Sequence, residues 1–263
     1  MSGHSHAKTV ARTKDANNQK KGQVFSKIAS IIAVAAKDGS DPAMNSKLRQ
    51  ALEEAKKFSM PKENIERAIK KGSGDIEGEQ LEEVFYEAMG PNNTALVLDG
   101  ITDNKNRALG EVRQILQKHN FKLADEGSVK WQFEQKGILI INSKSPNPSD
   151  QEKEEMELAV IEAGAEDIKW FKEETTECLE INTKPENLEQ VKKNLEAQGI
   201  KAESSSLGWI AKEEIDLPTN DREKLDKLFN DLDDSETVQN IYSNLKVWEL
   251  PIFNYQFSIN FQY

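Results

Sequence analysis

The sequence predicts an α+β protein of three domains, and three observations carry that prediction. The chain has 263 residues, more than the roughly 100–200 residues usual for one domain. Three helix-type patterns precede residue 73 and are followed by a glycine-rich stretch, KKGSGDIEGEQ, which is typical of a linker. After this linker, strand-type and helix-type segments alternate. We therefore expect a helical N-terminal domain followed by two domains that contain sheets.

The N-terminal domain is predicted to be a three-helix bundle preceded by a basic arm. The first helix is expected from Phe25, because Phe25, Ile28 and Ile32 recur at helical spacing. The second lies in DPAMNSKLRQALEEAKKF and the third in MPKENIERAIKKGSG, which Gly72 is placed to end. Short connections between amphipathic helices favour an antiparallel bundle. Arm and bundle together are assigned to residues 1–78.

The next segments have the order β-β-α-β. Two strands, LEEVFYEAMG and NTALVLDGIT, are joined through Gly90–Asn93, and a helix follows in NKNRALGEVRQILQKHN. The stretch GSVKWQF is expected to return as a strand. A sheet with only one helix needs a further cover, so residues 211–263, with a helix and a β-like run, are expected to rejoin it. This gives a discontinuous α+β domain of residues 79–136 and 211–263.

Residues 137–210 have a separate order, β-α-β-β-α-β. This is the order of a ferredoxin-like fold, in which two helices cover one face of a four-stranded sheet. The sequence therefore predicts a ferredoxin-like domain inserted into the α+β domain.

Charge is unevenly distributed along the chain. The net charge is −11, but residues 1–72 hold 15 Lys/Arg against 7 Asp/Glu, a net +8, and residues 73–263 hold 20 against 39, a net −19. A basic segment on an acidic body is typical of polyanion binding, because phosphate contacts release counterions while the acidic surface repels phosphate elsewhere. The alternative is that lysine-rich helices simply keep the protein in solution.

The candidate nucleic-acid-binding residues form three groups. The arm and the first helix supply His4, Lys8, Arg12, Lys14, Lys20, Lys21 and Lys27. The third helix supplies Arg67, Lys70 and Lys71, although cations near a helix C-terminus also stabilise the helix itself. The run TDNKNR supplies Asn104, Lys105, Asn106 and Arg107. Their amide and cationic donors suit RNA backbone or base edges, while Thr102 or Asp103 is expected to cap the following helix.

Other conspicuous side chains are expected to have structural roles. The pair His4 and His6 lacks the further ligands of a metal site, and His119 is expected to cap a helix. The acidic clusters Glu152–Glu157 and Asp231–Asp234 are expected on solvated helix faces. Cys178 is expected to be a buried thiol. The four tryptophans are expected mainly to fill cores, and a stacking role for one of them stays open: Trp131, Trp170, Trp209 and Trp248.

Several classes of function are disfavoured. The chain contains no phosphate-binding loop, dinucleotide-binding glycine pattern, Cys-x-x-Cys pair or nucleophile elbow, so we expect no enzyme, no cofactor, no metal and no small-molecule substrate. No apolar run reaches ~18 residues and no targeting segment is recognised, so we expect a cytoplasmic protein without a membrane partner. A single cysteine fits a reducing compartment. We expect a monomer when the protein is free.

The chain resembles the bacterial YebC proteins and their mitochondrial relatives that activate translation of a cytochrome c oxidase subunit. The matching motifs run in order along nearly the whole chain: Gly3-His4-Ser5, Phe25-Ser26-Lys27, AAKDGSDPAMNSKLRQALEEAK, MPKENIERAIKKGSG, ITDNKNR, EGSVKWQF and DD-x-x-x-VQNIYSN. The resemblance implies the same three-domain architecture. It also implies a ribosome-associated factor that binds ribosomal RNA and relieves stalling at proline-rich sequences, or alternatively a DNA-binding transcriptional regulator.

Three features depart from the family pattern. Ala7 stands where a tryptophan is usual, and the basic cluster that follows is thinner. Pro91–Thr94 replaces a glycine-rich turn. Residues after Asn244 continue past the point where many members end.

Overall fold

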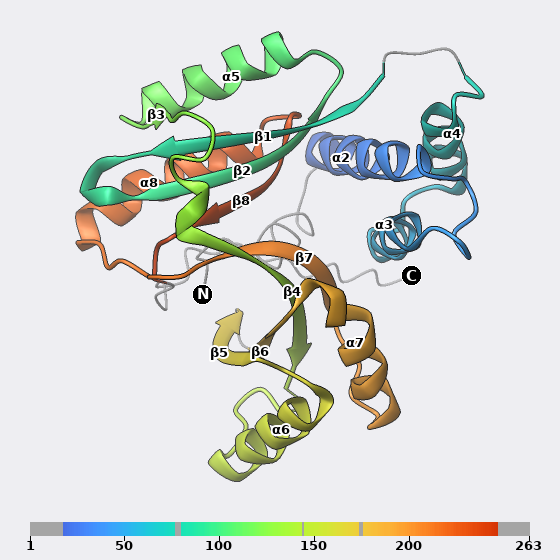
Figure 1. The fold of residues 1–263 in the computed structure, drawn as a ribbon, viewed down its shortest axis with the longest axis vertical. Helices are drawn as coiled ribbons and strands as arrows, with labels where there is room; N and C mark the ends of the chain where they lie inside the picture. The colour runs from blue at the N-terminus through green and yellow to red at the C-terminus, as the bar shows by residue number, and fades with distance from the viewer. Residues whose placement is uncertain (1–17, 77–79, 144, 174–175, 247–263) are drawn as a thin grey trace. The chain divides into compact units, whose positions relative to one another are not determined.

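The computed structural model describes residues 18–76, 80–143, 145–173 and 176–246. The chain divides into two compact units, one with residues 18–130 and Asp216–Ile241, the other with Trp131–Ile215 and residues 242–246. Three helices precede two four-stranded sheets, each accompanied by helices (Figure 1). The predicted α+β class is therefore confirmed.

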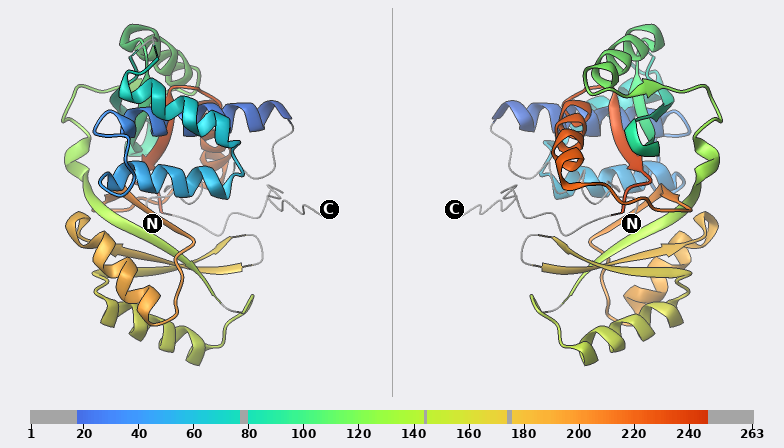
Figure 2. Two further views of the ribbon diagram at one scale, coloured as in Figure 1. Left: turned by 90° about the vertical axis from the view of Figure 1, so that its right-hand side faces the viewer. Right: turned by 90° about the vertical axis from the view of Figure 1, so that its left-hand side faces the viewer.

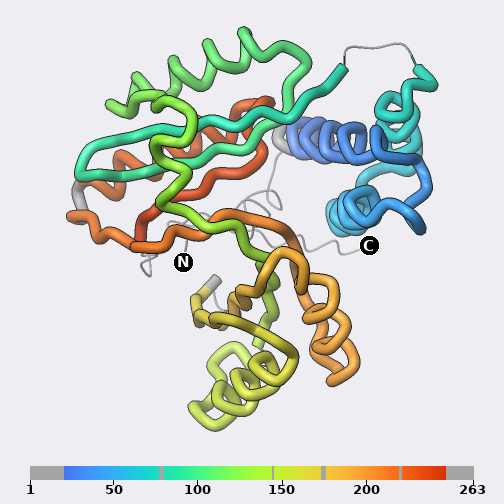
Figure 3. Tube along the Cα trace, viewed as in Figure 1, coloured from blue at the N-terminus to red at the C-terminus, as the bar shows by residue number. Residues whose placement is uncertain are grey.

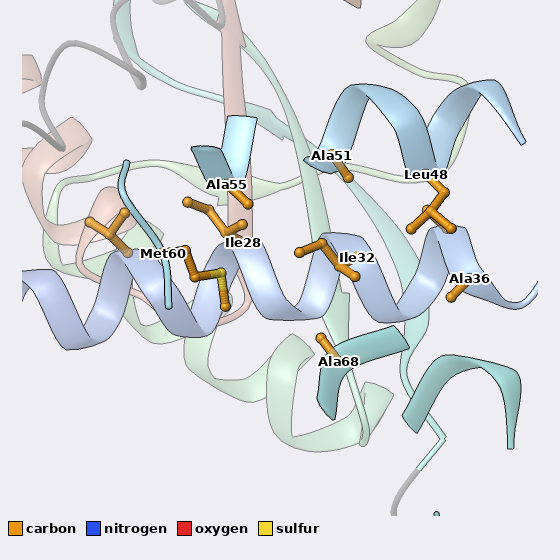
Figure 4. Packing of buried hydrophobic residues seen from close by; sticks show 10 residues of the cluster. Ile28, Ile32, Ala36, Leu48, Ala51, Ala55, Met60 and Ala68 are labelled. Atoms are coloured by element: carbon orange, nitrogen blue, oxygen red, sulfur yellow. The ribbon is translucent and has the colours of Figure 1, made fainter. Parts of the chain in front are cut away.

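The N-terminal region consists of α2 (Asn18–Ala36), α3 (Ser46–Lys57) and α4 (Lys62–Ser73), and α2 contacts the other two. Figure 4 shows Ile32 of α2 between Ala51 of α3 and Ala68 of α4. The first helix begins at Asn18, so the prediction of a start at Phe25 is wrong. Residues 18–24 are mainly polar and show no stripe, but Gln and Lys are good helix formers and extend the helix backwards.

The first sheet contains β1 (Glu82–Met89), β2 (Ala95–Thr102), β3 (Lys122–Leu123) and β8 (Val238–Ser243), in the order β3-β1-β2-β8. β1 pairs antiparallel with both β2 and β3, and a short 3-10 turn, η1 (Pro91–Asn93), joins β1 to β2. Helices α5 (Lys105–Lys118) and α8 (Thr219–Asp233) contact each other. β8 lies beside β2, so a strand that follows the second sheet in sequence belongs to the first sheet (Figure 3).

One strand was predicted in the wrong place. The stretch Gly127–Phe133 is a turn followed by a 3-10 helix, η2 (Lys130–Gln132), and only Phe133 belongs to a strand. The third strand of this sheet is the two-residue β3, which sequence analysis missed. The cause is Glu87 of β1, whose carboxylate takes the backbone N–H groups of Gly127, Val129 and Lys130 and thereby fixes the segment as a turn.

The inserted segment has the predicted ferredoxin-like order: β4 (Phe133–Asn142), α6 (Asp150–Ala163), β5 (Asp167–Glu173), β6 (Thr176–Thr183), α7 (Leu188–Ala197) and β7 (Ser204–Ala211), with a 3-10 turn, η3 (Pro185–Asn187), before α7. The strand order is β5-β6-β4-β7, and all neighbours are antiparallel. Both helices cover one face of this sheet (Figure 2). On that face Leu139 and Ile181 pack with Val160 of α6 and Leu195 of α7.

Candidate nucleic-acid interface

The predicted basic arm lies mostly outside the described residues. His4, Lys8, Arg12 and Lys14 lie outside the described residues, so their predicted role stays a prediction. Lys20 and Lys21 lie in the first turn of α2 rather than in an arm, and Lys21 is half-buried. A helix fixes the spacing of these two lysines along the chain. Any contact they make with a polyanion therefore comes from a regular element.

Lys27, a predicted nucleic-acid-binding residue, is held by another part of the chain. Its side chain is only 11% exposed, and Nζ donates to the backbone carbonyl of Asp233 at 2.5 Å and lies 3.5 Å from the carboxylate of the same residue. A lysine held in this way must break both contacts before it can bind phosphate. Its main role in this structure is to join α2 to the end of α8.

The cations of α4 lie where the prediction requires. Arg67, Lys70 and Lys71 are all exposed, while Ala68 faces the core at 6% exposure. Residues three and four apart share one face of a helix, so the Arg67 side chain neighbours both lysines. Gly74 ends the helix in the left-handed conformation, with φ 84°, and its N–H donates to the Lys70 carbonyl. The result is a rigid three-cation face on α4, which we call the α4 basic face: Arg67, Lys70 and Lys71.

A close approach of backbone holds α4 against α2. A Cβ atom built on Gly72 would lie 2.1 Å from the carbonyl oxygen of Ala33 and 2.8 Å from the Ala36 side chain. Only glycine fits at this distance. The last turn of α4, which carries Lys70 and Lys71, is therefore seated directly on α2.

Several polar groups of the TDNKNR turn, residues 102–107, are engaged in hydrogen bonds within the turn itself. Asn104 caps α5, and its side-chain oxygen accepts the N–H groups of Asn106 and Arg107 at 3.1 Å each. The prediction that Thr102 or Asp103 would be the cap is wrong, because the Thr102 hydroxyl instead accepts the Asn104 N–H at 3.0 Å.

The two cations of this turn are paired with carboxylates. Lys105 Nζ lies 2.6 Å from the Glu82 carboxylate, and the Lys105 ammonium holds the pKa of Glu82 below its usual value. Arg107 is paired with Asp103 one helical turn earlier. Both cations remain more than three-fifths exposed, at 63% and 67%. They can still meet phosphate, but only in competition with an existing partner.

The sequence did not predict the turn at residues 127–130, which a side chain of β1 holds in place. Glu87 is 3% exposed, and its carboxylate accepts the N–H groups of Gly127, Val129 and Lys130 at 2.6, 2.6 and 2.8 Å. The Lys130 ammonium lies 4.8 Å from the centre of the Phe85 ring. Sequence analysis had no signal for this, since Glu87 lies about 40 residues from the amides it binds.

The structure corrects two further predictions, one for the tryptophans and one for the acidic clusters. Trp131 is 67% exposed and so does not fill a core, Trp170 and Trp209 are half-buried, and Trp248 lies outside the described residues. The acids do not all face only solvent. Glu157 accepts the indole N–H of Trp170 at 2.6 Å, and the pair of Asp231 with Lys118 is 2.7 Å long.

The predictions for His119 and Cys178 are confirmed. His119 is the C-terminal cap residue of α5, and its Nε2 lies 2.7 Å from Asp231 of α8. Cys178 is fully buried in β6. Across the described residues, no group of three or more His, Cys, Asp and Glu side chains is placed to hold a metal, and no helix is both long and apolar enough to cross a bilayer.

Comparison with known proteins gives concordant results. Residues 5–75 match the TACO1/YebC N-terminal domain, and residues 81–245 match the TACO1/YebC second and third domains. Probable transcriptional regulatory proteins of Thermoanaerobacter pseudethanolicus and Pseudothermotoga lettingae are each 42% identical, covering 94% of this chain and 98% and 94% of those proteins. The crystal structure of a conserved hypothetical protein from Aquifex aeolicus, 38% identical, superposes with a TM-score of 0.79 over 90% of this chain and 95% of that one.

Proposed function

Because the chain belongs to the TACO1/YebC family, we propose that it is a non-enzymatic, nucleic-acid-binding regulator of gene expression that acts on the ribosome. In this proposal the basic N-terminal region binds ribosomal RNA, and the protein relieves stalling at proline-rich nascent sequences in the cytoplasm. Relatives named probable transcriptional regulatory proteins support the coarser part, a regulator of gene expression.

One observation supports a polyanion as the partner: positive and negative charges are unevenly divided along the chain. Residues 1–72 hold 15 Lys/Arg against 7 Asp/Glu, whereas residues 73–263 hold 20 against 39. Long-range repulsion from the acidic part leaves the N-terminal region as the favoured contact for phosphate. Within the described residues, the α4 basic face offers three exposed cations on one helix for this contact.

Ribosomal RNA fits this surface better than promoter DNA. The α4 basic face lies on a single helix with two lysines and one arginine in its last two turns, and these side chains suit phosphates. Base reading in duplex DNA requires a helix with several amide or guanidinium groups aimed into the major groove. Ribosomal RNA can be bound through its backbone and shape alone.

The experiment measures ribosome position on a message that encodes consecutive prolines, in reconstituted translation with and without the protein. We expect the full-length protein to shorten the pause. The matched variant Arg67→Gln, Lys70→Gln and Lys71→Gln should shorten it less, because three cations that bind phosphate have been removed.

The control removes the same charge from the ferredoxin-like domain by changing Lys172, Lys193 and Lys201 to Gln, three exposed side chains far from α4 in sequence. This control should shorten the pause as well as the wild type does. A full-length protein that leaves the pause unchanged would overturn the translation role. An equal reduction of the effect in both variants would show that net charge, and not the α4 basic face, matters.

The second candidate is a DNA-binding transcriptional regulator, and the names of the relatives favour it. It predicts a footprint on promoter DNA that survives an excess of competitor DNA. Specific binding typically exceeds non-specific binding by about 10³-fold or more, so such a footprint separates the two candidates.

A further inference from the structure

The turn between α2 and α3 presents a methionine to solvent. Met44 is 87% exposed, the highest value for a large apolar side chain among the residues that the structure describes. It stands four residues before Leu48, which is buried in the core of the bundle, and this spacing alone would put both on one buried stripe (Figure 4). The helix begins too late for that, because Asn45 is its N-terminal cap. Met44 therefore belongs to the turn and points away from the core.

Hydrogen bonds fix this turn against the end of α2. The Asp41 carbonyl accepts the N–H groups of Met44 and Asn45 at 3.1 and 2.9 Å. The Asn45 side chain, 8% exposed, donates to the carbonyls of Ala35 and Gly39 at 2.7 and 2.8 Å. Polar side chains on loops that a rigid scaffold positions are common functional sites, and here the scaffold positions an apolar one. The place of Met44 is thus set by α2.

The end of α2 that holds this turn also carries the end of the α4 basic face. The Asn45 side chain binds the Ala35 carbonyl. Gly72, which follows Lys71, is seated one residue away, since a Cβ atom on Gly72 would lie 2.8 Å from the Ala36 side chain. The turn with Met44 and the last turn of α4 therefore lie at the same end of the bundle.

This end of the bundle is rich in exposed cations. Three exposed lysines follow α2 or end α4: Lys37, Lys70 and Lys71. Lys47 Nζ lies 3.7 Å from the Asp38 carboxylate, and both side chains are 67% exposed, so phosphate can displace this weak pair. The Asp41 carboxylate accepts a backbone N–H of its own turn at 2.9 Å, and that of Asp75 accepts the Ser73 hydroxyl at 2.7 Å. An apolar tip therefore stands among cations.

This combination fits unpaired RNA. Cations attract phosphates, and proteins that grip nucleic acid insert apolar side chains, methionine among them, between partly unstacked bases. In RNA the bases of loops and bulges are already unstacked, so insertion there needs less energy than in a duplex. The methionine thioether is polarizable and makes favourable contacts with aromatic rings. An apolar groove on a protein would leave the lysines without counter-charges.

We propose that Met44 is an apolar wedge that inserts beside an unpaired base of ribosomal RNA, while Lys70 and Lys71 hold neighbouring phosphates. The proposal rests on the function proposed above and adds a contact to bases. Phosphate contacts position a protein but carry no information about the bases. A wedge requires an unstacked step, so Met44 selects loops and bulges over regular helices.

The first test measures binding to purified ribosomes by sedimentation across a salt series. Met44→Gln should weaken binding about tenfold with an unchanged salt slope, because it removes the burial of one apolar side chain and no charge. Met44→Leu keeps an apolar side chain of similar volume and should bind as the wild type does.

The matched control is Leu158→Gln, which removes an apolar side chain 56% exposed in the ferredoxin-like domain. It should bind as the wild type does. Equal losses in Met44→Gln and Leu158→Gln would overturn the proposal, because any exposed apolar side chain would then have the same effect. Thermal unfolding of each variant confirms that the fold is kept.

The reactivity of ribosomal RNA bases toward dimethyl sulfate locates the wedge. The wild type should change the reactivity of a few unpaired bases, and Met44→Gln should lose these changes at a saturating protein concentration. Changes that Met44→Gln retains in full would overturn this inference alone. A wild type that neither binds ribosomes nor alters any base would overturn the proposed function together with it.

Cross-linking from the tip identifies its partner. The variant Met44→p-azidophenylalanine is bound to ribosomes and irradiated, and we expect a cross-link to ribosomal RNA. Cross-links to ribosomal proteins alone would overturn the proposal and assign the tip to a protein surface.

Discussion

The carboxylate of Glu87 accepts the backbone N–H of Val129 at 2.6 Å, although 42 residues separate the two. The same carboxylate accepts the N–H groups of Gly127 and Lys130, so one buried side chain satisfies three backbone donors of a turn. A turn without these bonds would leave the Val129 N–H buried and unpaired, which costs free energy. Glu87 therefore decides the conformation of the segment that enters β4.

Replacing Glu87 by Gln should destabilise the protein strongly. Hydrogen bonds to a charged acceptor contribute more than neutral ones, and the amide NH₂ of Gln would face a backbone N–H, so we expect a decrease of about 2–4 kcal/mol in the free energy of unfolding. Urea denaturation measures it. Glu83→Gln, an exposed position on the same strand, is the control and should change the unfolding free energy little. A decrease at Glu87 no larger than at Glu83 would contradict the role given to the carboxylate.

The contribution of Glu87 should depend on pH. Burial acts to raise the pKa of Glu87, but the three backbone N–H bonds outweigh it, and the pKa lies below its usual value. A lowered pKa gives stability that is complete above the unfolded value of about 4.3 and is lost as pH falls through the folded value. The difference between wild type and Glu87→Gln should therefore shrink as urea denaturation is repeated from neutral pH down to about pH 3. A constant difference would show that the negative charge is not what stabilises the turn.

The sequence predicts those elements whose signals are local. The stripes of α3 and α4 and each segment of the β-α-β-β-α-β order are visible within short windows of sequence. The prediction that Gly72 ends the third helix is wrong by two residues, because α4 continues through Ser73 and Gly74 adopts the left-handed cap conformation. The strand predicted at residues 127–133 failed because Val129, Trp131 and Phe133 alternate like strand residues. Their backbone donors are taken by Glu87, and no local pattern reveals a partner so distant in sequence.

The candidate site shows the same limit. The exposure of Arg67, Lys70 and Lys71 could be predicted from sequence because an exposed helix face needs no distant partner. Lys27 was misjudged because the carbonyl that it binds belongs to Asp233, about 200 residues away. The Lys105 pair with Glu82 was missed for the same reason.

The close approach of α4 to α2 predicts opposite effects at two glycines. Gly72→Ala should destabilise the protein by about 1–3 kcal/mol, because its methyl group would clash with the Ala33 carbonyl and force the helices apart. Gly110→Ala, in α5, meets nothing within 4 Å and should stabilise by about 0.5–1 kcal/mol through helix propensity. Thermal unfolding of both variants checks this. A neutral Gly72→Ala would show that α2 and α4 are not held at this distance.

The contact between α5 and α8 should be modestly stabilising and sensitive to salt. Asp231 accepts from Lys118 Nζ and lies 2.7 Å from His119 Nε2, and these two groups, Lys118 first, hold the pKa of Asp231 below its usual value. The Asp231 side chain is 32% exposed, so solvent weakens the pair, and Asp231→Asn should cost about 0.5–1 kcal/mol. Glu223→Gln, an exposed acid on α8, is the control. A cost that high salt leaves unchanged would mean that packing, rather than charge, accounts for the contact.

Neutralising the cations of the arm and of the first turn of α2 should weaken binding to ribosomal RNA and flatten its salt dependence. The variant changes five cations to Gln: Lys8, Arg12, Lys14, Lys20 and Lys21. Each phosphate that the protein no longer neutralises lowers the slope of log K against log salt concentration by about 0.7–0.9, so removal of five cations would lower it by up to about 4. Binding is measured by ribosome sedimentation across a salt series. The control changes five lysines of the ferredoxin-like domain: Lys172, Lys184, Lys192, Lys193 and Lys201. It has the same net charge and should keep the wild-type slope. The slope could instead stay unchanged in this five-cation variant and fall in the variant with Arg67→Gln, Lys70→Gln and Lys71→Gln. That result would place the phosphate-binding cations on α4 alone.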